Sequence, residues 1–288
     1  MNELILVDFS WLYNRYYYVT SYNAEISNKT NEIKDRLQKA LMEFLNVVHR
    51  AYPKSKVLLL LDPSTATLKN KLIFEGYKQN RDKEAKKEVY SYLRDVVKFL
   101  CSELSSKYFF FLKGKGYEAD QLIAFLTKKY YKKNKIIIFS GDKDLLQLTS
   151  YSNTFIADKF EKGCFLVKTN QEIFGKFKNS KGEDFTRAST NVRDILKYRS
   201  LKGDPSDNLS PVFPRIKDKE IIEIIKNYWT DDQKEELTES RIEEILESMR
   251  GCNATLASKL QESKGTWLRN YKIMDLLHVD DISIRRLR

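Results

Sequence analysis

Acidic residues stand directly after the most apolar runs of this sequence. Asp8 follows LILV, Asp62 follows VLLLL, and Asp142 and Asp144 follow KIIIF. Any one of these carboxylates could be ordinary turn or helix-cap chemistry. Together, however, they would form a dense negative cluster, and such a cluster repels itself unless cations neutralise it.

A further apolar run, YFFFL at 108–112, leads through a short glycine-containing turn to Glu118 and Asp120. Asp120 precedes QLIAFL, so we expect it to serve partly as a helix cap. Oxygen-only ligation by carboxylates suits Mg²⁺ or Mn²⁺, and two such ions are the usual device for phosphodiester chemistry. The strand-end acids therefore predict a site for two or more divalent ions.

The apolar runs at 4–7, 57–61, 108–112 and 135–139 are separated by longer segments with helical periodicity. Runs without polar alternation are typical of strands in a parallel sheet that helices cover on both faces. We therefore predict an α/β fold with a mostly parallel sheet flanked by helices. The acids would then gather at the carboxyl edge, where open α/β sheets bind ligands. Residues 153–169 resemble a further hairpin.

The pattern becomes helical and charged from about residue 187 onward. We therefore divide the chain into an α/β core at 1–190 and a helical, DNA-binding region at 191–288 that packs on the core. The sequence contains no internal repeat or low-complexity tract.

The overall charge indicates the kind of partner. With 51 Lys and Arg against 40 Asp and Glu, the 288-residue chain carries a formal net charge of +11, which favours a polyanion. No segment approaches the roughly 18 apolar residues of a membrane span, and the N-terminus MNELILVDFS lacks a basic leader and a cleavage site. We therefore expect nucleic acid, and no membrane, as the partner.

The cysteines and histidines limit which kinds of site and catalysis the chain can provide. Cys101, Cys164 and Cys252 form an odd set without CxxC spacing, which argues against disulfides and zinc and favours buried thiols in a reducing compartment. His49 and His278 each lie beside apolar residues in an expected helix. We therefore do not expect histidine catalysis, and a metal-activated water needs no imidazole base.

An alternative interpretation concerns GKGYEA at 114–119, which matches a G-x-G-x-x-A dinucleotide fingerprint between a strand and a helix. In that interpretation Glu118 and Asp120 would stand at the helix N-terminus, where a pyrophosphate belongs. Because this arrangement is repulsive, we favour the metal site.

Five motifs follow one another along the chain: LILVD ending at Asp8, LLLLD ending at Asp62, GYEAD at 116–120, SGDKDLLQL at 140–148 and GDPSDN at 203–208. In order and spacing they resemble the motif series of the 5′ nucleases. This family includes bacteriophage flap endonucleases, 5′ to 3′ exonucleases and the 5′ nuclease domain of bacterial repair polymerases. The resemblance extends from about residue 4 to residue 228.

The resemblance implies a metal-dependent enzyme that acts at 5′ ends. It implies a helical arch around residues 75–105 over the active site and a C-terminal helical, helix-hairpin-helix-like region. It also implies that two or more Mg²⁺ or Mn²⁺ ions are held by a larger set of acids. These are Asp8, Asp62, Glu118, Asp120, Asp142, Asp144, Asp204 and Asp207.

The same resemblance assigns YKQNR at 77–81 to the start of the arch. Lys78 and Arg81 lie three residues apart, hence on one helix face, and we expect them to stabilise the developing charge of the scissile phosphate. Tyr77 would stack on a terminal base. Lys83 is a candidate DNA contact, for which a solvated basic helix is the alternative.

Two departures from the family pattern stand out. Where the family writes GYEADD, this chain has Gln121, so one metal ligand is neutral or lost. After GDPSDN the family continues with a glycine-rich loop, whereas this chain continues LSPVFPRIKDKE. We expect Arg215, Lys217 and Lys219 to replace backbone amides as the phosphate anchor there, with a solvated loop as the alternative.

We therefore expect a Mg²⁺-dependent 5′ to 3′ exonuclease or flap endonuclease, a monomer in the cytoplasm of a bacterium or of a virus-infected host cell. Its substrate would be DNA with a 5′ end or 5′ flap. Two alternatives stay open: a ribonuclease that removes RNA primers from RNA–DNA hybrids, and a non-catalytic protein that binds branched DNA. The presence of Asp142, Asp144, Asp204 and Asp207 speaks against the second.

Overall fold

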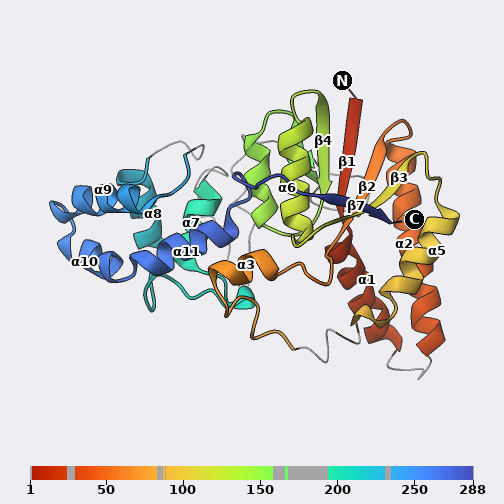
Figure 1. Ribbon diagram of the computed structural model, residues 1–288, viewed down its shortest axis with the longest axis horizontal. Coiled ribbons are helices and arrows are strands. Elements are labelled where there is room, and N and C mark those ends of the chain that lie inside the picture. Colours follow the sequence, from red (N-terminus) through yellow and green to blue (C-terminus); the bar gives the residue numbers. More distant parts are fainter. Residues whose placement is uncertain are drawn as a thin grey trace.

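The protein was analysed as a computed structural model, which describes residues 2–24, 30–82, 87, 89–157, 166–167, 194–230 and 235–287. Within these residues the centre is a seven-stranded sheet with the order β6-β5-β4-β1-β2-β3-β7 (Figure 1). Strands β1 to β5 run parallel, and β6 and β7 pair antiparallel at the two edges. The predicted mostly parallel sheet is confirmed. The strands are β1 (Asn2–Asp8), β2 (Lys56–Leu61), β3 (Phe109–Gly114), β4 (Asn134–Phe139), β5 (Thr154–Ala157), β6 (Leu166–Val167) and β7 (Ile284–Leu287).

Helices cover both faces of the sheet. Because side chains alternate along a strand, Ile5 and Val7 of β1 are buried on one face, whereas Leu4 and Leu6 are buried on the other. This two-sided burial explains why the central strands are continuously apolar. The first face packs on α1 (Phe9–Ala24), α2 (Thr30–Ala51) and α5 (Leu93–Glu103), and the second on α6 (Ala119–Tyr130) and the 3₁₀ helix η1 (Asp144–Ser150).

The helix α5 limits the extent of any arch. Its Val96, Val97 and Leu100 are buried in the core of the first face, because they recur on one side of the helix. α5 is therefore a core helix, and only the residues between Ile73 and Leu93 are left for the arch expected around 75–105. Within that interval, residues 83–86 and 88 lie outside the described part of the chain.

A helical lobe follows, as predicted. Trp229 and Trp267 pack edge to face in its core, with ring centroids 5.1 Å apart. The short helix α3 (Leu68–Ile73) lies beside the lobe and contacts α11 (Figure 1). The lobe consists of α7 (Ile195–Lys202), α8 (Asp218–Asn227), α9 (Glu239–Arg250), α10 (Ala254–Glu262) and α11 (Lys264–Met274).

The chain then returns to the core. Leu276, Leu277, Val279 and Ile282 pack on the second face of the sheet, and β7 pairs with β3. This pairing satisfies the backbone groups of an otherwise open sheet edge. The helical region expected at 191–288 thus ends in a strand of the core sheet, which its short, charged sequence did not indicate.

The hairpin expected at 153–169 is represented by the antiparallel pairing of β5 with β6. Residues 158–165, including Cys164, lie outside the described residues.

The cysteines and His278 differ in part from what their sequence context predicted. Cys101 is partly buried, but Cys252 is exposed rather than buried. His278 follows α11 instead of lying in a helix, and its Nδ1 is 2.6 Å from Asp275 Oδ2. None of the described helices combines the length and apolarity needed to cross a membrane.

Candidate active site

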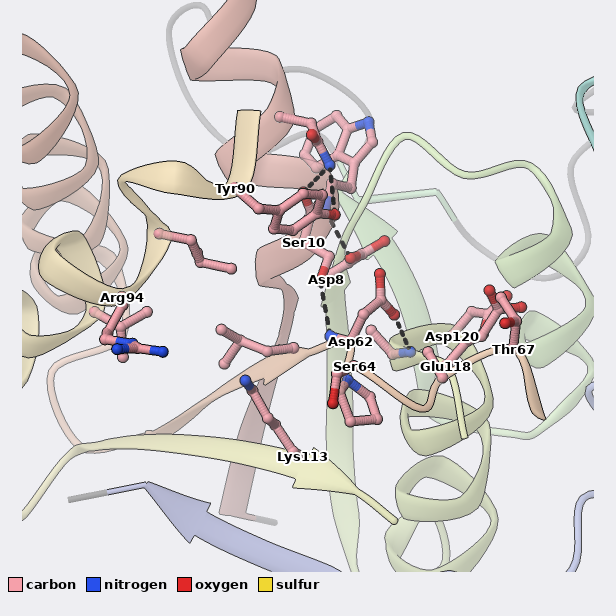
Figure 2. Close-up of a pocket in the computed structure, with 18 of the residues that line it drawn as sticks. Asp8, Ser10, Asp62, Ser64, Thr67, Tyr90, Arg94, Lys113, Glu118 and Asp120 are labelled. Carbon is pink, nitrogen blue, oxygen red and sulfur yellow. Dashed lines mark hydrogen bonds between the residues drawn. The ribbon is translucent and has the colours of Figure 1, made fainter. Parts of the chain in front are cut away.

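A cavity of about 850 Å³ opens at the carboxyl edge of the parallel strands (Figure 2). The register brings the strand ends together, because Asp8 of β1 pairs with Leu60 of β2, and Val7 pairs with Phe139 of β4. The acids that follow different strands therefore meet, as their positions in the sequence predicted. The acids that line the cavity are Asp8, Asp62, Glu118, Asp120 and Asp142.

Asp8, the last residue of β1, is held through both carboxylate oxygens. Its Oδ1 accepts a hydrogen bond from the Trp11 backbone N–H at 2.9 Å, and its Oδ2 accepts one from the Ser140 hydroxyl at 2.9 Å. Burial raises the pKa of Asp8 to about 7, against the two hydrogen bonds and with the help of Asp62 and Asp142. The carboxylate is therefore well oriented but poorly neutralised.

Asp62 connects the end of β2 to the start of α6. Its Oδ1 accepts a hydrogen bond from the Ala119 backbone N–H at 2.8 Å, and its own N–H donates to the Ser10 hydroxyl at 2.9 Å. A carboxylate at a helix N-terminus is favoured both by the free N–H groups and by the helix dipole. These contacts hold the first turn of α6 against the ends of β1 and β2.

Glu118 and Asp120 stand at the start of α6. Burial and the nearby charge of Glu118 raise the pKa of Asp120, against the attraction of Lys78. The Asp120 Oδ1 also accepts a hydrogen bond from the Gln121 N–H at 2.6 Å. The expectation that Asp120 caps the helix is wrong, because Glu118 is the N-cap of α6 and Asp120 lies inside its first turn. Asp120 therefore lines the acidic cavity and also accepts a hydrogen bond within the first turn of α6.

Gln121 turns away from the acids. Its Oε1 accepts a hydrogen bond from the Glu118 N–H at 3.0 Å, and its Nε2 donates to Asn70 Oδ1 at 3.2 Å. Asn70 in turn donates to Glu118 Oε2 at 3.2 Å. The amide at this position therefore closes the cap of α6 and supports Glu118 indirectly.

Asp142 and Asp144 follow β4 but face different surroundings. Asp142 lines the cavity, and its Oδ1 accepts a hydrogen bond from the Asp144 N–H at 2.9 Å. The side chain of Asp144 turns toward Arg199 of α7, whose Nε lies 2.6 Å from Asp144 Oδ1. The two acids of SGDKD therefore belong to different electrostatic environments.

Arg199 bridges two acids from separate motifs. Its Nη2 lies 2.5 Å from Asp204 Oδ2 and 3.3 Å from Asp144 Oδ2. Burial would raise the pKa of Asp204, but Arg199 and the hydrogen bonds from Ser206 outweigh it and hold that pKa below its ordinary value. Arg199 thus neutralises Asp204, whereas burial outweighs its attraction at Asp144 and raises the pKa of that acid to about 7.

The GDPSDN segment is a tight turn built around the short 3₁₀ helix η5 (Pro205–Asp207). Asp204 caps it by accepting a hydrogen bond from the Ser206 N–H at 2.9 Å. Gly203 has φ 74°, and a Cβ there would lie 2.5 Å from the Leu209 carbonyl oxygen, so glycine is required by both conformation and space. The local sequence therefore determines where the two acids of this motif point.

The turn at 76–81 docks on this motif. The Lys78 N–H donates to the Asp207 carbonyl at 3.0 Å, and Asn208 Nδ2 donates to the Gly76 carbonyl at 2.7 Å. Lys78 has φ 54°, an unusual conformation for a residue with a side chain, and these contacts offset its cost. The expectation that Lys78 and Arg81 share a helix face is wrong, because residues 75–80 form turns.

Lys78 and Arg81 nevertheless both line the cavity. Lys78 forms an ion pair with Glu118, and its Nζ lies 3.8 Å from Asp207 Oδ2. The Arg81 Nη2 lies 2.7 Å from Asp207 Oδ1. Both candidate catalytic cations are therefore placed at the acidic edge, where they neutralise two of the predicted metal-binding acids.

Tyr77 has a different environment from the one expected. Its side chain is only 2% exposed and packs in the core of the helical lobe, and its hydroxyl donates to Glu118 Oε2 at 2.6 Å. The expected stacking on a terminal base is therefore wrong, because the ring faces are already covered. Tyr77 instead orients the carboxylate of Glu118.

The remaining candidate DNA contacts stay predictions. Arg215, Lys217 and Lys219 are exposed around the start of α8, as a phosphate anchor would require. Lys83 lies outside the described residues.

The acids converge without yet forming a closed cation cage. Among the described residues, no group of three or more His, Cys, Asp or Glu side chains stands in a geometry that would hold a metal ion. The donor set nevertheless fits a hard divalent cation, since it consists of carboxylates, and burial and like charge raise the pKa of Asp8 and Asp120. Small side-chain movements would have to complete such a site.

Sequence reasoning missed several residues that organise the site. Arg199 precedes GDPSDN by four residues on a short helix, and only its closeness to that motif could have suggested a role. Asn70 and Ser140 support Glu118 and Asp8 from other elements and carry no local signal. Lys113, near the end of β3, also lines the cavity, and a lysine that ends a strand is usually read as solvated.

Comparison with protein families matches residues 3–178 to the family model described as 5′–3′ exonuclease, N-terminal resolvase-like domain. The chain is similar to a 5′–3′ exonuclease of Mycoplasmopsis pulmonis, with 26% identity over 91% of this chain and 74% of the relative. It is also similar to a 5′–3′ exonuclease of Bacillus subtilis, with 26% identity over 81% of this chain and 72% of the relative.

Two solved structures share the fold. The T5 D15 protein co-crystallized with metal ions superposes with a TM-score of 0.67 and 16% identity, covering 96% of this chain and 90% of that chain. The bacteriophage T5 D15 flap endonuclease in a pseudo-enzyme-product complex with DNA and metal ions gives a TM-score of 0.64 at 16% identity, with the same coverage. These similarities extend over the core and the helical lobe.

Proposed function

The chain belongs to the 5′–3′ exonuclease family, and from this premise we propose that it hydrolyses DNA phosphodiesters at 5′ ends or 5′ flap junctions in a Mg²⁺-dependent reaction. The observation that carries the proposal is the convergence of acids from four strand ends on one cavity, next to Lys78 and Arg81. Such a cavity combines ligands for cations with donors for a phosphate.

Two or more divalent ions, Mg²⁺ or Mn²⁺, are the proposed cofactors. Ions bound there would supply charge neutralisation and an activated water for the hydrolysis. Carboxylates alone form the donor set, which suits these hard cations better than softer metals. In this proposal the ligands are the cavity acids Asp8, Asp62, Glu118, Asp120 and Asp142, together with Asp144 and Asp204 beside Arg199 and Asp207 beside Arg81.

Lys78 and Arg81 would act on the scissile phosphate. Their present partners, Glu118 and Asp207, are themselves proposed ligands. With cations held by those carboxylates, the two side chains would be free to donate to phosphate oxygens, where charge develops in the transition state. Asp8 would keep its orientation through Trp11 and Ser140 while this exchange takes place.

Duplex DNA is proposed to lie along the helical lobe, with Arg215, Lys217 and Lys219 as phosphate contacts near the start of α8. Each cation that neutralises a duplex phosphate contributes about 0.9 to the slope of log K against log[salt]. The double variant Lys217→Ala, Lys219→Ala should therefore reduce that slope by about 1.8. An unchanged slope and affinity would remove this loop from the proposed interface.

A turnover assay on 5′-labelled flap substrates tests this function. We propose that the protein acts as a monomer. We expect cleavage of a DNA flap in Mg²⁺ and none in EDTA. RNA flaps and RNA–DNA hybrids are compared in parallel, and faster cleavage of these would favour the ribonuclease alternative. Tight binding of flap DNA without cleavage in either Mg²⁺ or Mn²⁺ would favour the non-catalytic binding protein.

A further inference from the structure

A second set of charges lines the same cavity. Lys113 of β3 and Arg94 and Lys98 of α5 face the cavity together with the acids. We call these three residues the basic wall. In Figure 2 the Lys113 side chain extends into the cavity between Asp62 and Arg94.

The fold holds the basic wall in place from two elements. Arg94 and Lys98 are four residues apart on α5, hence on one side of the helix, and the opposite side is anchored by the buried Val96 and Leu100. Lys113 pairs in register with Leu61 of β2. Its position is therefore set by the hydrogen-bonded sheet and not by a mobile loop.

Within the described part of the chain the basic wall has no ion-paired acid, in contrast to Lys78, Arg81 and Arg199 at the same edge. Lys78, Arg81 and Arg199 are each ion-paired with an acid. Throughout the described ranges, no ion pair joins Lys113, Arg94 or Lys98 to an acid at 4.0 Å or less.

Lys113 is also partly removed from water. Burial lowers its pKa, and the neighbouring Arg285 of β7 lowers it further, with only Asp62 acting in the opposite direction. A cation that is desolvated and lies beside another cation gains more from an incoming anion than a fully hydrated lysine does. Among the described residues, Asp62 is the one acid that acts on Lys113, and it forms no ion pair with it.

We propose that the basic wall binds a second phosphate of the substrate strand, next to the phosphodiester that is cleaved. This inference rests on the proposed function. The acidic side of the cavity repels phosphate unless cations cover it, whereas the basic wall attracts phosphate directly. The bound group is either the 5′-terminal phosphomonoester or an internal phosphodiester, and both present non-bridging oxygens to lysine and arginine donors.

The test compares Lys113→Gln with Lys115→Gln, which removes the same charge from an exposed residue that does not line the cavity. Binding of oligonucleotides with a 5′ overhang is measured in EDTA, with a 5′-phosphate or a 5′-hydroxyl. Lys113→Gln should weaken binding about tenfold, and Lys115→Gln should leave it close to that of the parent. The slope of log K against log[salt] should fall by about 0.7, the value per phosphate for single strands.

The two oligonucleotides distinguish the two sources of phosphate. If Lys113→Gln weakens binding only of the 5′-phosphorylated strand, the wall holds the terminal phosphate. If it weakens both equally, the wall holds an internal phosphodiester. The double variant Arg94→Gln, Lys98→Gln removes the two cations that α5 contributes to the wall. The same measurements on this variant test the proposal if Lys113→Gln folds poorly.

Kinetics on a cleaved substrate give an independent readout. Lys113→Gln should raise KM about tenfold with kcat nearly unchanged, because the contact is present in both the ground state and the transition state. The basic-wall proposal is overturned if Lys113→Gln and the double variant both behave like Lys115→Gln in binding and in KM. That outcome differs from a failure of the proposed function, in which the parent protein would not cleave DNA at all.

Discussion

Apart from Glu118, which pairs with Lys78, the acids at the carboxyl edge form two groups that differ in how their mutual repulsion is relieved. In the first, Asp8, Asp62, Asp120 and Asp142 line the cavity, and among the described residues none of these four is in an ion pair. Burial therefore raises the pKa of Asp8 and Asp120. We call these four residues the unpaired group.

The second group is held by arginines of the protein itself. Arg199 bridges Asp144 and Asp204, and Arg81 pairs with Asp207. We call these three acids the arginine-paired group. Residue type alone therefore does not define a cation site. The unpaired group is open to cations from solvent, whereas a cation at the arginine-paired group has to share or displace an arginine.

The strongest test of this comparison is removal of one unpaired acid. We expect Asp142→Asn to lower kcat for flap cleavage by roughly a thousandfold, about 4 kcal/mol, because a carboxylate that binds the catalytic cations is lost. Binding of duplex DNA in EDTA should stay intact or tighten, since a charge that repels phosphate is removed. Steady-state kinetics with saturating Mg²⁺ measure the first effect.

The control for this experiment is Asp280→Asn, which removes an exposed acid that pairs with Lys69 and does not line the cavity. It should cleave at the parent rate. If Asp142→Asn also cleaves at that rate in saturating Mg²⁺, the assignment of the cavity as the active site is wrong.

The pH dependence of stability should reveal the buried acids of both groups, because burial raises the pKa of Asp8 and of Asp144 to about 7. The ordinary pKa of Asp8 is 3.8, and burial raises it to about 7 in the folded protein, so the folded state binds the proton more tightly between these values. The free energy of unfolding of the metal-free protein should therefore fall as the pH rises from about 4 to about 7, by roughly 3–4 kcal/mol. Asp204, whose pKa is lowered, loses its stabilising contribution only as the pH falls below its ordinary range.

Urea unfolding in EDTA at a series of pH values measures this effect. Asp8→Asn should make the decrease between pH 4 and pH 7 shallower, because one of the two acids whose pKa is raised to about 7 is removed while Asp144 remains. An Asp8→Asn profile that is parallel to the parent profile would show that Asp8 is ionised normally in the folded protein.

Arg199→Met removes the cation that pairs with Asp144 and Asp204 of the arginine-paired group. The side chains of Arg199, Asp144 and Asp204 are 15% to 22% exposed, so we expect a loss of about 2 kcal/mol in EDTA, less than for a fully buried pair. The added stabilisation by Mg²⁺ should become larger in the variant, because two carboxylates have lost their internal cation.

Thermal unfolding with and without Mg²⁺ measures both parts, and Arg199→Lys serves as the matched control that keeps the charge. Equal melting temperatures for the parent and Arg199→Met in EDTA would contradict a neutralising role for this arginine.

The smallest effect concerns Gln121, which supports Glu118 beside the unpaired group. Gln121→Asp shortens the side chain that caps α6, so we expect a loss of about 1 kcal/mol of stability. The Mg²⁺ activation curve should stay unmoved, because this side chain faces Asn70 and the Glu118 backbone. Gln121→Glu, which keeps the reach, should restore the cap, and a shifted activation curve in Gln121→Asp would place position 121 beside a cation.

Part of this site follows from local patterns in the sequence. Continuous apolar runs require two covered faces, and parallel strands require their carboxyl ends to lie at one edge, so the meeting of Asp8, Asp62 and Asp142 could be predicted. The GDPSDN turn is equally local, since Gly203 and the capping Asp204 act within a few residues. The turn at Lys78 is not, because its conformation depends on contacts with a segment 129 residues later, at Asp207.

The sequence by itself therefore determined the sheet, the order of its acids and the kind of chemistry they can support. Only the tertiary structure decided which acids are neutralised by Arg199 and Arg81, that Tyr77 is buried against Glu118, and that β7 closes the sheet beside Lys113. The physical reason is the range of the interactions. Alternation of side chains and helix capping depend on a few neighbouring residues. Ion pairs and strand pairing at a sheet edge join residues from distant parts of the chain, and the periodicity of the sequence does not reveal these contacts.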